Sequence, residues 1–527
     1  MGQPVAHRAL LLLLRLIIAT AQRPDDEVKQ FPGYPGVMPS KVFSGYLKAH
    51  AEGQTFYSHY VLTESQRNPS ADPLVLWQQG GPGSSGFGYG YLAELGPYVL
   101  NADSLDNATV PTPQRNFKSW DTISNLLLFE HPPGTGFSYC VDAAEKPIAC
   151  EWNDQTQAKA FYNTLLAFYE AWPTFAAHDL KIIGESYAGL LIPFLVYEIF
   201  TQHPDETPAR QLSGIAIGNG CPGTAGSTPS KRGSCNGPFG SYDTQHIMEL
   251  AYGHGALPRA LWNALAKACG FPCAAPLWTE DCASFSEECS ALLNNASAAI
   301  GDFNIYNFVD NCGDGNQEAT GVSSAGARRP QIGSFLDHRV RFGAAADGAS
   351  EGVPHEGGQE YPCGTGTAAT RWCNIPSVRE ALHMHPEAFY GQPWALQAGA
   401  GMHYTTYTGA SYDLYPEIVQ HIPVLIYNGD VDACVPYNSN ADWIDSMVTM
   451  QGYRVAEPWR PWMLDRGGGA KVVSGYVTSY ATAPGPFRPD HYNLTFLTIK
   501  DSGHMVPQYQ PDRALAFFTR WLDHEPY

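Results

Sequence analysis

The chain has 527 residues, of which 44% are hydrophobic and 16% are charged, and its formal net charge is −20. This composition excludes a disordered chain, which combines low hydrophobicity with high charge. The acidic excess argues against a nucleic-acid-binding protein, because contacts with phosphates need a basic surface. With 12 cysteines, 52 glycines and 41 prolines, the chain has the profile of a loop-rich globular enzyme from an oxidising compartment. Its length alone suggests about three or four domains.

Residues 1–21 have the pattern of a secretory signal peptide. The apolar run Ala9–Ala21 ends in the small-residue motif Ala19-Thr20-Ala21, which is typical of a cleavage site. A short buried helix is the competing interpretation, but a polar and then proline-rich segment follows at once. No other run of about 18 uninterrupted apolar residues occurs, so the sequence predicts no membrane span. We therefore expect a protein of the secretory pathway, either secreted or vacuolar/lysosomal.

Three Asn-x-Ser/Thr sequons agree with that route. They are predicted N-glycosylation sites at Asn107, Asn295 and Asn493. Because such sequons are common by chance, they add only modest weight to the secretory interpretation.

Residues 22–220 alternate between strand-like and helix-like runs. The predicted strands are Pro73–Trp77, Asn125–Phe129, Leu180–Ile183 and Ile215–Ile217, and the predicted helices are Gln155–Phe175 and Leu190–Phe200. Alternation of this kind predicts an α/β fold, in which helices cover both faces of a mostly parallel sheet.

The pattern breaks over residues 221–372, which are rich in Gly, Ala, Ser and Cys and contain only short helical segments. We interpret this region as an inserted cap. The α/β pattern returns in residues 373–527, with predicted strands at Val424–Tyr427 and Thr495–Ile499 and a last amphipathic helix at Pro511–Leu522.

Ser186 is the candidate nucleophile. It stands in Gly184-Glu-Ser-Tyr-Ala-Gly189, between a predicted strand and a predicted helix. A nucleophile elbow needs this arrangement, because small residues on both sides of the serine permit its strained turn. A literal Gly-x-Ser-x-Gly match at Gly348–Gly352 lacks the flanking strand and helix, so we reject it. The alternative role for Ser186 is a helix N-cap.

A serine nucleophile needs a base and an acid that orients the base, and in this fold they follow in the order Ser, Asp, His. Asp432 and His504 each follow a predicted strand directly, where the carboxyl end of a parallel sheet places catalytic groups. Asp430 competes with Asp432 for the acid role, and the residues alone do not separate the two. Because Ser186 and His504 must meet, residues 22–220 and 373–527 form one catalytic domain in this interpretation.

The oxyanion of an acyl-transfer reaction needs backbone N–H donors near the serine. The N–H of Tyr187 is one candidate, and the glycine loop Gln79–Gly86 offers the other, because glycine permits close backbone approach. A phosphate-binding loop is a poorer interpretation, since no Lys-Ser/Thr pair follows the glycines.

Four stretches, Trp77–Ser85, Gly184–Gly189, Gly429–Asp432 and Gly503–Pro507, resemble the signatures of the serine carboxypeptidase family of the cathepsin A and carboxypeptidase Y type. The resemblance implies an α/β-hydrolase core with an inserted cap. It assigns Ser186, Asp432 and His504 as the catalytic triad, and the N–H groups of Gly81 and Tyr187 as the oxyanion hole.

The resemblance also implies a site for the terminal carboxylate of the substrate. That site comprises Gln79, Gly80 and Glu185, and Glu94 is expected to hydrogen-bond to Glu185. An ionised Glu185 would repel the substrate carboxylate, whereas a protonated one can donate a hydrogen bond to it. Two carboxyls that share a proton have one strongly raised pKa, so we expect peptidase activity that is highest at acidic pH. The competing role for Glu185 is a solvated acid at a helix start.

The chain departs from the family pattern at two positions. Gln79 stands where the family usually has Asn, and Ser84 stands where it usually has Cys. The second change removes a usual partner of the Cys363 region, so we expect Cys363 to pair with Cys373. Other pairs suggested are Cys140 with Cys150 and Cys221 with Cys235, and Cys434 resembles a free thiol of some family members. Parity would then leave one of Cys269, Cys273, Cys282, Cys289 and Cys312 unpaired.

The sequence thus predicts a serine-type carboxypeptidase that releases C-terminal amino acids through an acyl-enzyme and acts on the C-termini of peptides or proteins. Met505, after the predicted base, resembles the apolar lining of members that prefer hydrophobic residues, although a core methionine is the alternative. We expect no metal and no cofactor, and a homodimer stays open. The alternative functions are acyl transfer, which plant relatives perform on this scaffold, and a non-catalytic role in a complex.

Overall fold

The computed structural model describes residues 23–105, 109–224, 233–234, 241–271, 286–301, 303–310, 364–389, 392–406, 410–466, 469–482 and 494–527. The expected signal peptide lies outside these residues, as do the sequons at Asn107 and Asn493 and the cysteines Cys235 and Cys363.

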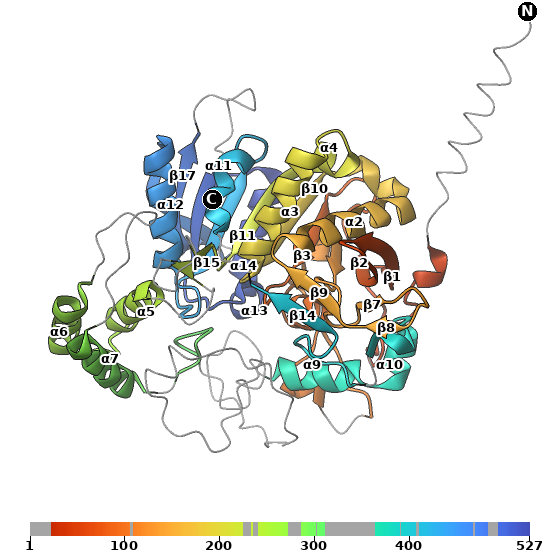
Figure 1. Cartoon of the computed structure of the whole chain (residues 1–527), viewed down its shortest axis with the longest axis horizontal. Helices are drawn as coiled ribbons and strands as arrows, with labels where there is room; N and C mark the ends of the chain where they lie inside the picture. Colours follow the sequence, from red (N-terminus) through yellow and green to blue (C-terminus); the bar gives the residue numbers. More distant parts are fainter. Residues whose placement is uncertain are drawn as a thin grey trace, which may run out of the picture.

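A large mixed sheet forms the centre of the described molecule (Figure 1). Its strand order is β16-β17-β18-β15-β11-β10-β3-β6-β2-β7-β8, and β1 pairs with β2 off this path. The strands are β1 (Val42–Ala51), β2 (Gln54–Thr63), β3 (Leu74–Gln78), β6 (Asn125–Phe129), β7 (Tyr139–Val141), β8 (Pro147–Ile148), β10 (Leu180–Glu185), β11 (Leu212–Gly218), β15 (Val424–Gly429), β16 (Arg454–Asp465), β17 (Lys471–Ala481) and β18 (Leu494–Ile499).

The six strands from β6 to β18 run parallel to one another and form the middle of the sheet. Alternate side chains enter two separate apolar cores: Leu74 and Leu76 of β3 face one, and Val75 and Trp77 face the other. A strand that is buried on both faces needs a continuous apolar run, and this requirement explains why the sequence shows these strands so clearly. The predicted α/β fold is confirmed.

Helices cover both faces of the sheet. The first core contains side chains of α2 (Thr156–Ala171), α3 (Ala188–Gln202), α11 (Tyr415–Ile418) and α12 (Tyr437–Gln451). The second contains side chains of η2 (Gly86–Leu95), α9 (Thr365–Cys373), α10 (Pro376–Ala381), α13 (Val506–Tyr509) and α14 (Pro511–Asp523). The predicted helix 155–175 ends early, at Ala171, because the residue before Pro173 is disfavoured in helical geometry.

After β11 the chain leaves the sheet and forms α5 (Ser241–Gly253), α6 (Arg259–Cys269) and α7 (Glu287–Ile300), drawn in green to one side of the sheet in Figure 1. These helices share an apolar cluster of their own, which includes Leu265 and Leu293. The expected limits of the cap, residues 221 and 372, stay predictions.

Short elements complete the described chain. They are η1 (Pro24–Asp26), β4 (Tyr98–Val99), η3 (Ala102–Leu105), β5 (Gln114–Arg115), η4 (Trp120–Thr122), β9 (Cys150–Asn153), η5 (Pro173–Ala177), α4 (Thr207–Gln211), β12 (Gly223–Thr224), β13 (Gly233–Ser234), η7 (Pro386–Phe389), β14 (Met402–Thr405) and η8 (Ser411–Asp413). No helix of the described part has both the length and the hydropathy of a membrane span.

The cysteines confirm one predicted pair and correct another. Cys140 is bonded to Cys150 as expected, and Cys269 is bonded to Cys289, which joins α6 to α7. The expected pairing of Cys373 is wrong, because Cys373 is a fully buried free cysteine on α9. Its side chain belongs to the apolar core that α9 forms with η2, so it packs as a small hydrophobic residue.

A substitution at Phe517 of α14 would test how strongly the stability of the second core depends on this last helix. The ring of Phe517 is fully buried and lies 4.6 Å, centroid to centroid, from the ring of Tyr427 on β15. We expect Phe517→Ala to lower the free energy of unfolding by about 3–5 kcal/mol in chemical denaturation. Asp512→Ala, on the same helix, breaks only an exposed ion pair with Lys118 and should cost at most about 1 kcal/mol. Equal losses in the two variants would contradict this view of the core.

Candidate active site

Ser186 lies in a strained turn between β10 and α3. Its φ is +61°, a value that a serine adopts only where the surrounding structure enforces it. Its N–H donates to the carbonyl oxygen of Gly218 at 3.0 Å, and its carbonyl accepts from the N–H of Cys221 at 2.9 Å. A Cβ on Gly184 would lie 2.2 Å from the carbonyl oxygen of Gln78, so this turn tolerates only glycine there. The predicted elbow geometry is present.

The carboxylate of Asp432 holds His504. Oδ2 of Asp432 accepts from Nδ1 of His504 at 2.7 Å, and both side chains are buried. The same carboxylate accepts from Nδ2 of Asn219 at 2.8 Å and from the backbone N–H groups of Cys434 at 2.8 Å and Val435 at 3.1 Å. These four donors fix the carboxylate without neutralising its charge.

Asn219 was missed as a site residue by sequence reasoning. It follows β11, has φ +41°, and accepts from the N–H of Gly429 at 2.9 Å while it donates to Asp432. Its position in Gly218-Asn-Gly220, directly after a buried strand, is the signal that could have found it.

The imidazole of His504 is prepared to accept a proton. Since Nδ1 donates to Asp432, Nε2 carries the lone pair, and it is buried without a hydrogen-bond partner among the described residues. Burial lowers the pKa of His504, but the charge and hydrogen bond of Asp432 and the charge of Glu185 outweigh this effect and raise it above its usual value. Because β10, β15 and β18 are parallel, the residues that follow them, Ser186 among them, gather at one edge of the sheet.

Asp430, the competitor of Asp432, occupies a different environment. Its N–H donates to the carbonyl of Ile499, and one oxygen of its buried carboxyl has no hydrogen-bond partner in the described part of the chain. Burial, together with the charge of Asp501, raises the pKa of Asp430 to about 6. The contact with His504 is made by Asp432.

The glycine loop lies directly against the elbow. A Cβ on Gly80 would come within 2.6 Å of both the Ser186 Cβ and the Tyr187 nitrogen, so only glycine permits this approach. The next residue, Gly81, has φ +117°, which again favours glycine. The two predicted oxyanion donors, Gly81 and Tyr187, thus come from neighbouring segments.

The residue that replaces the family's usual cysteine has a polar partner. Ser84 and the side-chain amide of Gln397 hydrogen-bond at 2.8–2.9 Å, and the N–H of Ser85 donates to the carbonyl of Leu396 at 2.8 Å. The N–H of Ala398 donates to the carbonyl of Gly83 at 2.7 Å. Residues 396–398, which follow the predicted insertion, therefore hold the glycine loop by hydrogen bonds.

Two buried carboxyls lie beside the candidate nucleophile. Glu185 and Glu94 are 1% and 2% exposed and hydrogen-bond to each other, and Nε2 of Gln79 donates to Oε1 of Glu185 at 2.6 Å. Apart from that carboxyl–carboxyl bond, Oε2 of Glu185 and both oxygens of Glu94 have no donor among the described residues. A hydrogen bond between two carboxyl groups requires a proton on one of them.

The protonation of this pair is set mainly by burial. Burial raises the pKa of Glu185 to about 7, although the charge of His504 and the hydrogen bond from Gln79 act in the opposite direction. Burial also raises the pKa of Glu94 well above its usual range, and the negative charge of Glu185 adds to the effect. The amide of Gln79 is itself oriented by Nε1 of Trp77, which donates to its Oε1 at 2.9 Å.

Met505 lies at a small pocket rather than in the middle of a core. The pocket is bordered by Gly88, Tyr89, Ala93, Asn304, Thr365, Gly366, Leu396, Met505, Gln508 and Tyr509. Ala93, the residue before Glu94, and Met505, the residue after His504, both border this pocket.

Of the three predicted glycosylation sites, the structure describes Asn295. Asn295 is exposed on α7, so an attached glycan would meet solvent there. Among the described residues no group of three or more His, Cys, Asp or Glu side chains could hold a metal ion.

Comparisons with known proteins identify the family of the chain and its fold. The sequence model of the serine carboxypeptidase family matches residues 32–524. The chain is 30% identical to serine carboxypeptidase-like 20 of Arabidopsis thaliana, over 97% of this chain and 96% of the relative, and 30% identical to the lysosomal protective protein of Mus musculus, over the full length of both. Serine carboxypeptidase 1 of Hordeum vulgare is 29% identical over 94% and 92% of the two chains.

Among solved structures, the prohormone-processing carboxypeptidase Kex1 of Saccharomyces cerevisiae has the same fold, with a TM-score of 0.61 and 18% identity over 95% of this chain and 96% of that one. The sequence match spans both parts of the sheet and every segment that surrounds Ser186. The chain therefore belongs to the serine carboxypeptidase family.

Proposed function

We propose that this protein is a serine-type carboxypeptidase that releases C-terminal amino acids from peptides at acidic pH. The observation that carries the proposal is the buried pair Glu94–Glu185, which adjoins the nucleophile and is oriented by Gln79. Acyl transfer by a triad does not require a protonated carboxyl pair at this place. Recognition of a terminal carboxylate does, because hydrogen-bond donors are needed there.

In the proposed mechanism Oγ of Ser186 attacks the scissile carbonyl, and Nε2 of His504 accepts its proton. Asp432 holds the imidazole with Nε2 available and stabilises the positive charge that forms. The N–H groups of Gly81 and Tyr187 would bind the developing oxyanion. His504 then gives its proton to the departing amino acid, and water cleaves the acyl-enzyme by the reverse sequence of proton transfers.

The terminal carboxylate of the substrate would lie against Glu185, the Gln79 amide and the N–H of Gly80. If both glutamates were ionised, Glu94, Glu185 and the substrate carboxylate would place three negative charges in one buried space, where they would repel one another strongly. With a proton on the glutamate pair, Glu185 instead donates a hydrogen bond to the substrate carboxylate. Binding of a free C-terminus therefore requires a pH at which the pair keeps that proton.

The two titrating groups work against each other over part of the pH range. The Glu94–Glu185 pair must be protonated to bind the substrate carboxylate, whereas His504 must be neutral to accept the proton of Ser186. The negative charge of Glu185 is one cause of the raised pKa of His504. When Glu185 takes up a proton, that contribution disappears, so the pair in its binding form also favours the neutral imidazole.

The pocket at Met505 supports a proposal about the terminal residue of the substrate. Met505, Tyr89 and Leu396 give it an apolar wall. We therefore propose a preference for substrates with hydrophobic terminal residues and a location in the secretory pathway, secreted or in a vacuole or lysosome. Acyl transfer to another acceptor is the alternative function, since it would use the same Ser186 and His504.

The first test compares a blocked dipeptide with its C-terminal amide. We expect the free acid to be cleaved with a kcat/KM about 10- to 100-fold higher than the amide, because the amide forfeits charge-assisted hydrogen bonds at Gln79 and Glu185. Ser186→Ala is the control and should abolish cleavage of both. Equal cleavage of acid and amide would remove the argument for an exopeptidase, and an acyl-enzyme that yields only acyl-transfer products would favour the alternative.

The second test follows the pH dependence. The raised pKa of Glu185, about 7, means that the pair is protonated below this pH and ionises above it. For a peptide with a free carboxylate, kcat/KM should therefore fall as the pH rises through about 7, while hydrolysis of an ester without a terminal carboxylate should not fall. In Glu185→Gln, which keeps a donor but cannot ionise, the peptide profile should lose this fall. An unchanged fall in the variant would assign the transition to another group.

The third test separates the two aspartates. Asp432→Asn should lower kcat by about 10³- to 10⁴-fold, because the amide disturbs the tautomer and removes the charge that stabilises the imidazolium. Asp430→Asn changes a carboxyl of the same loop that does not contact His504, so its kcat should stay within a few-fold of that of the unaltered protein. Single-turnover kinetics with an activated ester provide the measurement. The reverse ranking would exchange the two proposed roles.

A further inference from the structure

Asp154 is a fully buried carboxylate that the proposed mechanism does not use. It lies between β9 and α2, and its side chain accepts two phenol hydrogen bonds. Oη of Tyr404 donates to Oδ1 of Asp154 at 2.6 Å, and Oη of Tyr187 donates to the same carboxylate. Burial, followed by the negative charge of Asp154, raises the pKa of both phenols, so both hydroxyls keep their protons and act as donors.

Tyr187 links this carboxylate to the nucleophile. It follows Ser186 directly, it is 2% exposed, and its backbone N–H is one of the two proposed oxyanion donors. The direction of that N–H is set by ψ of Ser186 and φ of Tyr187, and Tyr187 has φ −59° directly before α3. A side chain held at its far end by a buried carboxylate resists rotation about these torsions. The hydrogen bond of the Tyr187 hydroxyl can thus fix the orientation of the backbone N–H of the same residue.

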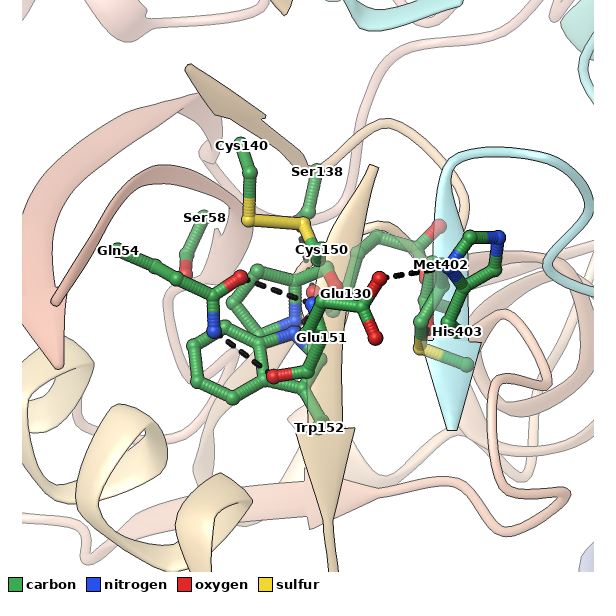
Figure 2. The surroundings of a disulfide bond; sticks show 12 residues. Gln54, Ser58, Glu130, Ser138, Cys140, Cys150, Glu151, Trp152, Met402 and His403 are labelled. Carbon is green, nitrogen blue, oxygen red and sulfur yellow. Dashed lines mark hydrogen bonds and ion pairs between the residues drawn. A yellow bond between two sulfur atoms is a disulfide. The ribbon is translucent and has the colours of Figure 1, made fainter. Parts of the chain in front are cut away.

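The position of Asp154 is fixed by β9. The Cys140–Cys150 disulfide holds the first residue of this strand, and the side chain of Gln54 forms two hydrogen bonds, at 2.7 and 2.8 Å, with the backbone of Glu151 (Figure 2). Nε1 of Trp152 donates to the carbonyl of Pro133 at 2.9 Å. A carboxylate carried by such a strand is a rigid reference point for Tyr187.

The second phenol comes from β14, which pairs in parallel with β9 and places Tyr404 opposite Trp152. Nδ1 of His403 is bound to Oε1 of Glu151 at 2.7 Å, which adds a side-chain link between the two strands (Figure 2). The strand also touches the glycine loop, because a Cβ on Gly83 would lie 2.6 Å from the methyl carbon of Met402. The two-stranded sheet of β9 and β14 therefore contacts both segments that supply the proposed oxyanion donors.

We propose that Asp154 is a positioning residue of the oxyanion hole, which acts by fixing the hydroxyl of Tyr187 and is itself held by Tyr404. The proposal rests on the proposed chemistry of Ser186. A buried carboxylate that only stabilises the fold is the competing interpretation. The two differ in one respect: a positioning residue alters stabilisation of the transition state, whereas a structural one alters stability alone.

Tyr187→Phe tests this directly, because it removes one hydroxyl and keeps the ring and the backbone N–H. Tyr162→Phe is a matched control: Tyr162 is 2% exposed, its hydroxyl donates to Oε2 of Glu206 at 2.5 Å, and its ring stacks on His203 at the C-terminal end of α3, opposite the end that follows Ser186. Two rates are measured in the full chain. They are the phosphorylation of Ser186 by diethyl p-nitrophenyl phosphate and the turnover of an activated ester, with kcat and KM resolved.

We expect Tyr187→Phe to lower the phosphorylation rate constant and kcat by about tenfold, a part of the 10²- to 10³-fold that loss of a whole oxyanion donor costs, with KM unchanged. Tyr404→Phe should act in the same direction with a smaller effect, and Tyr162→Phe should change neither rate. Unchanged rates in both Tyr187→Phe and Tyr404→Phe, or a change in KM alone, would overturn the proposal. If Tyr187→Phe does not fold, Tyr404→Phe decides by the same criteria.

The readouts separate this proposal from the proposed function. Phosphorylation of Ser186 needs the oxyanion donors but neither a peptide nor the Glu94–Glu185 pair. A protein that is phosphorylated at Ser186 but cleaves no peptide would refute the carboxypeptidase while the role of Asp154 is still decided by the variants. Absence of Ser186 phosphorylation in the unaltered protein would overturn both.

Discussion

The active-site geometry depends on one carboxylate. Asp432 accepts hydrogen bonds from the imidazole of His504, the amide of Asn219 and two backbone N–H groups of its own loop. These partners follow β18, β11 and β15, so the carboxylate joins the ends of three parallel strands at the edge where Ser186 also lies. Each donor is held by backbone that continues a buried strand. The carboxylate is therefore removed from water, and the donors around it have little freedom to rearrange. That arrangement keeps Nδ1 of His504 protonated and its Nε2 available.

The carboxyl pair Glu94–Glu185 differs from Asp432 in the number of hydrogen-bond donors around it. Asp432 meets four hydrogen-bond donors, whereas Glu94 and Glu185 share a single amide donor, from Gln79. Donors to the charged form of a carboxyl offset the cost of burying it, so burial raises the pKa of the pair that has only one such donor. In the proposed mechanism the pair binds an anion only while it holds a proton, whereas His504, whose pKa is raised, must be neutral, so both requirements are met only in a limited pH range.

The sequence was sufficient for the fold and for the residues that follow buried strands. The parallel strands are continuous apolar runs, and the turns after them carry Ser186, Asp432 and His504 in the expected order. Sequence alone could not separate Asp430 from Asp432, because both occupy the same loop and only the contact with His504 distinguishes them. It also missed Gln397, whose partner Ser84 is 313 residues away and replaces the cysteine that the family usually has there. Hydrogen bonds between polar residues that lie far apart in the sequence produce no local periodicity from which they could be predicted.

Asp154 is the extreme case of such a hidden pairing. In the sequence it is an acidic residue in a polar turn before a helix, where solvent exposure or a cap is the ordinary expectation. Its burial depends on Tyr404, which lies 250 residues further along the chain on the segment that returns after the insertion. The same return segment supplies Gln397 and Met402 to the glycine loop. The segment that follows the predicted insertion thus contacts both segments that supply the proposed oxyanion donors, so the candidate site depends on the chain on both sides of that insertion.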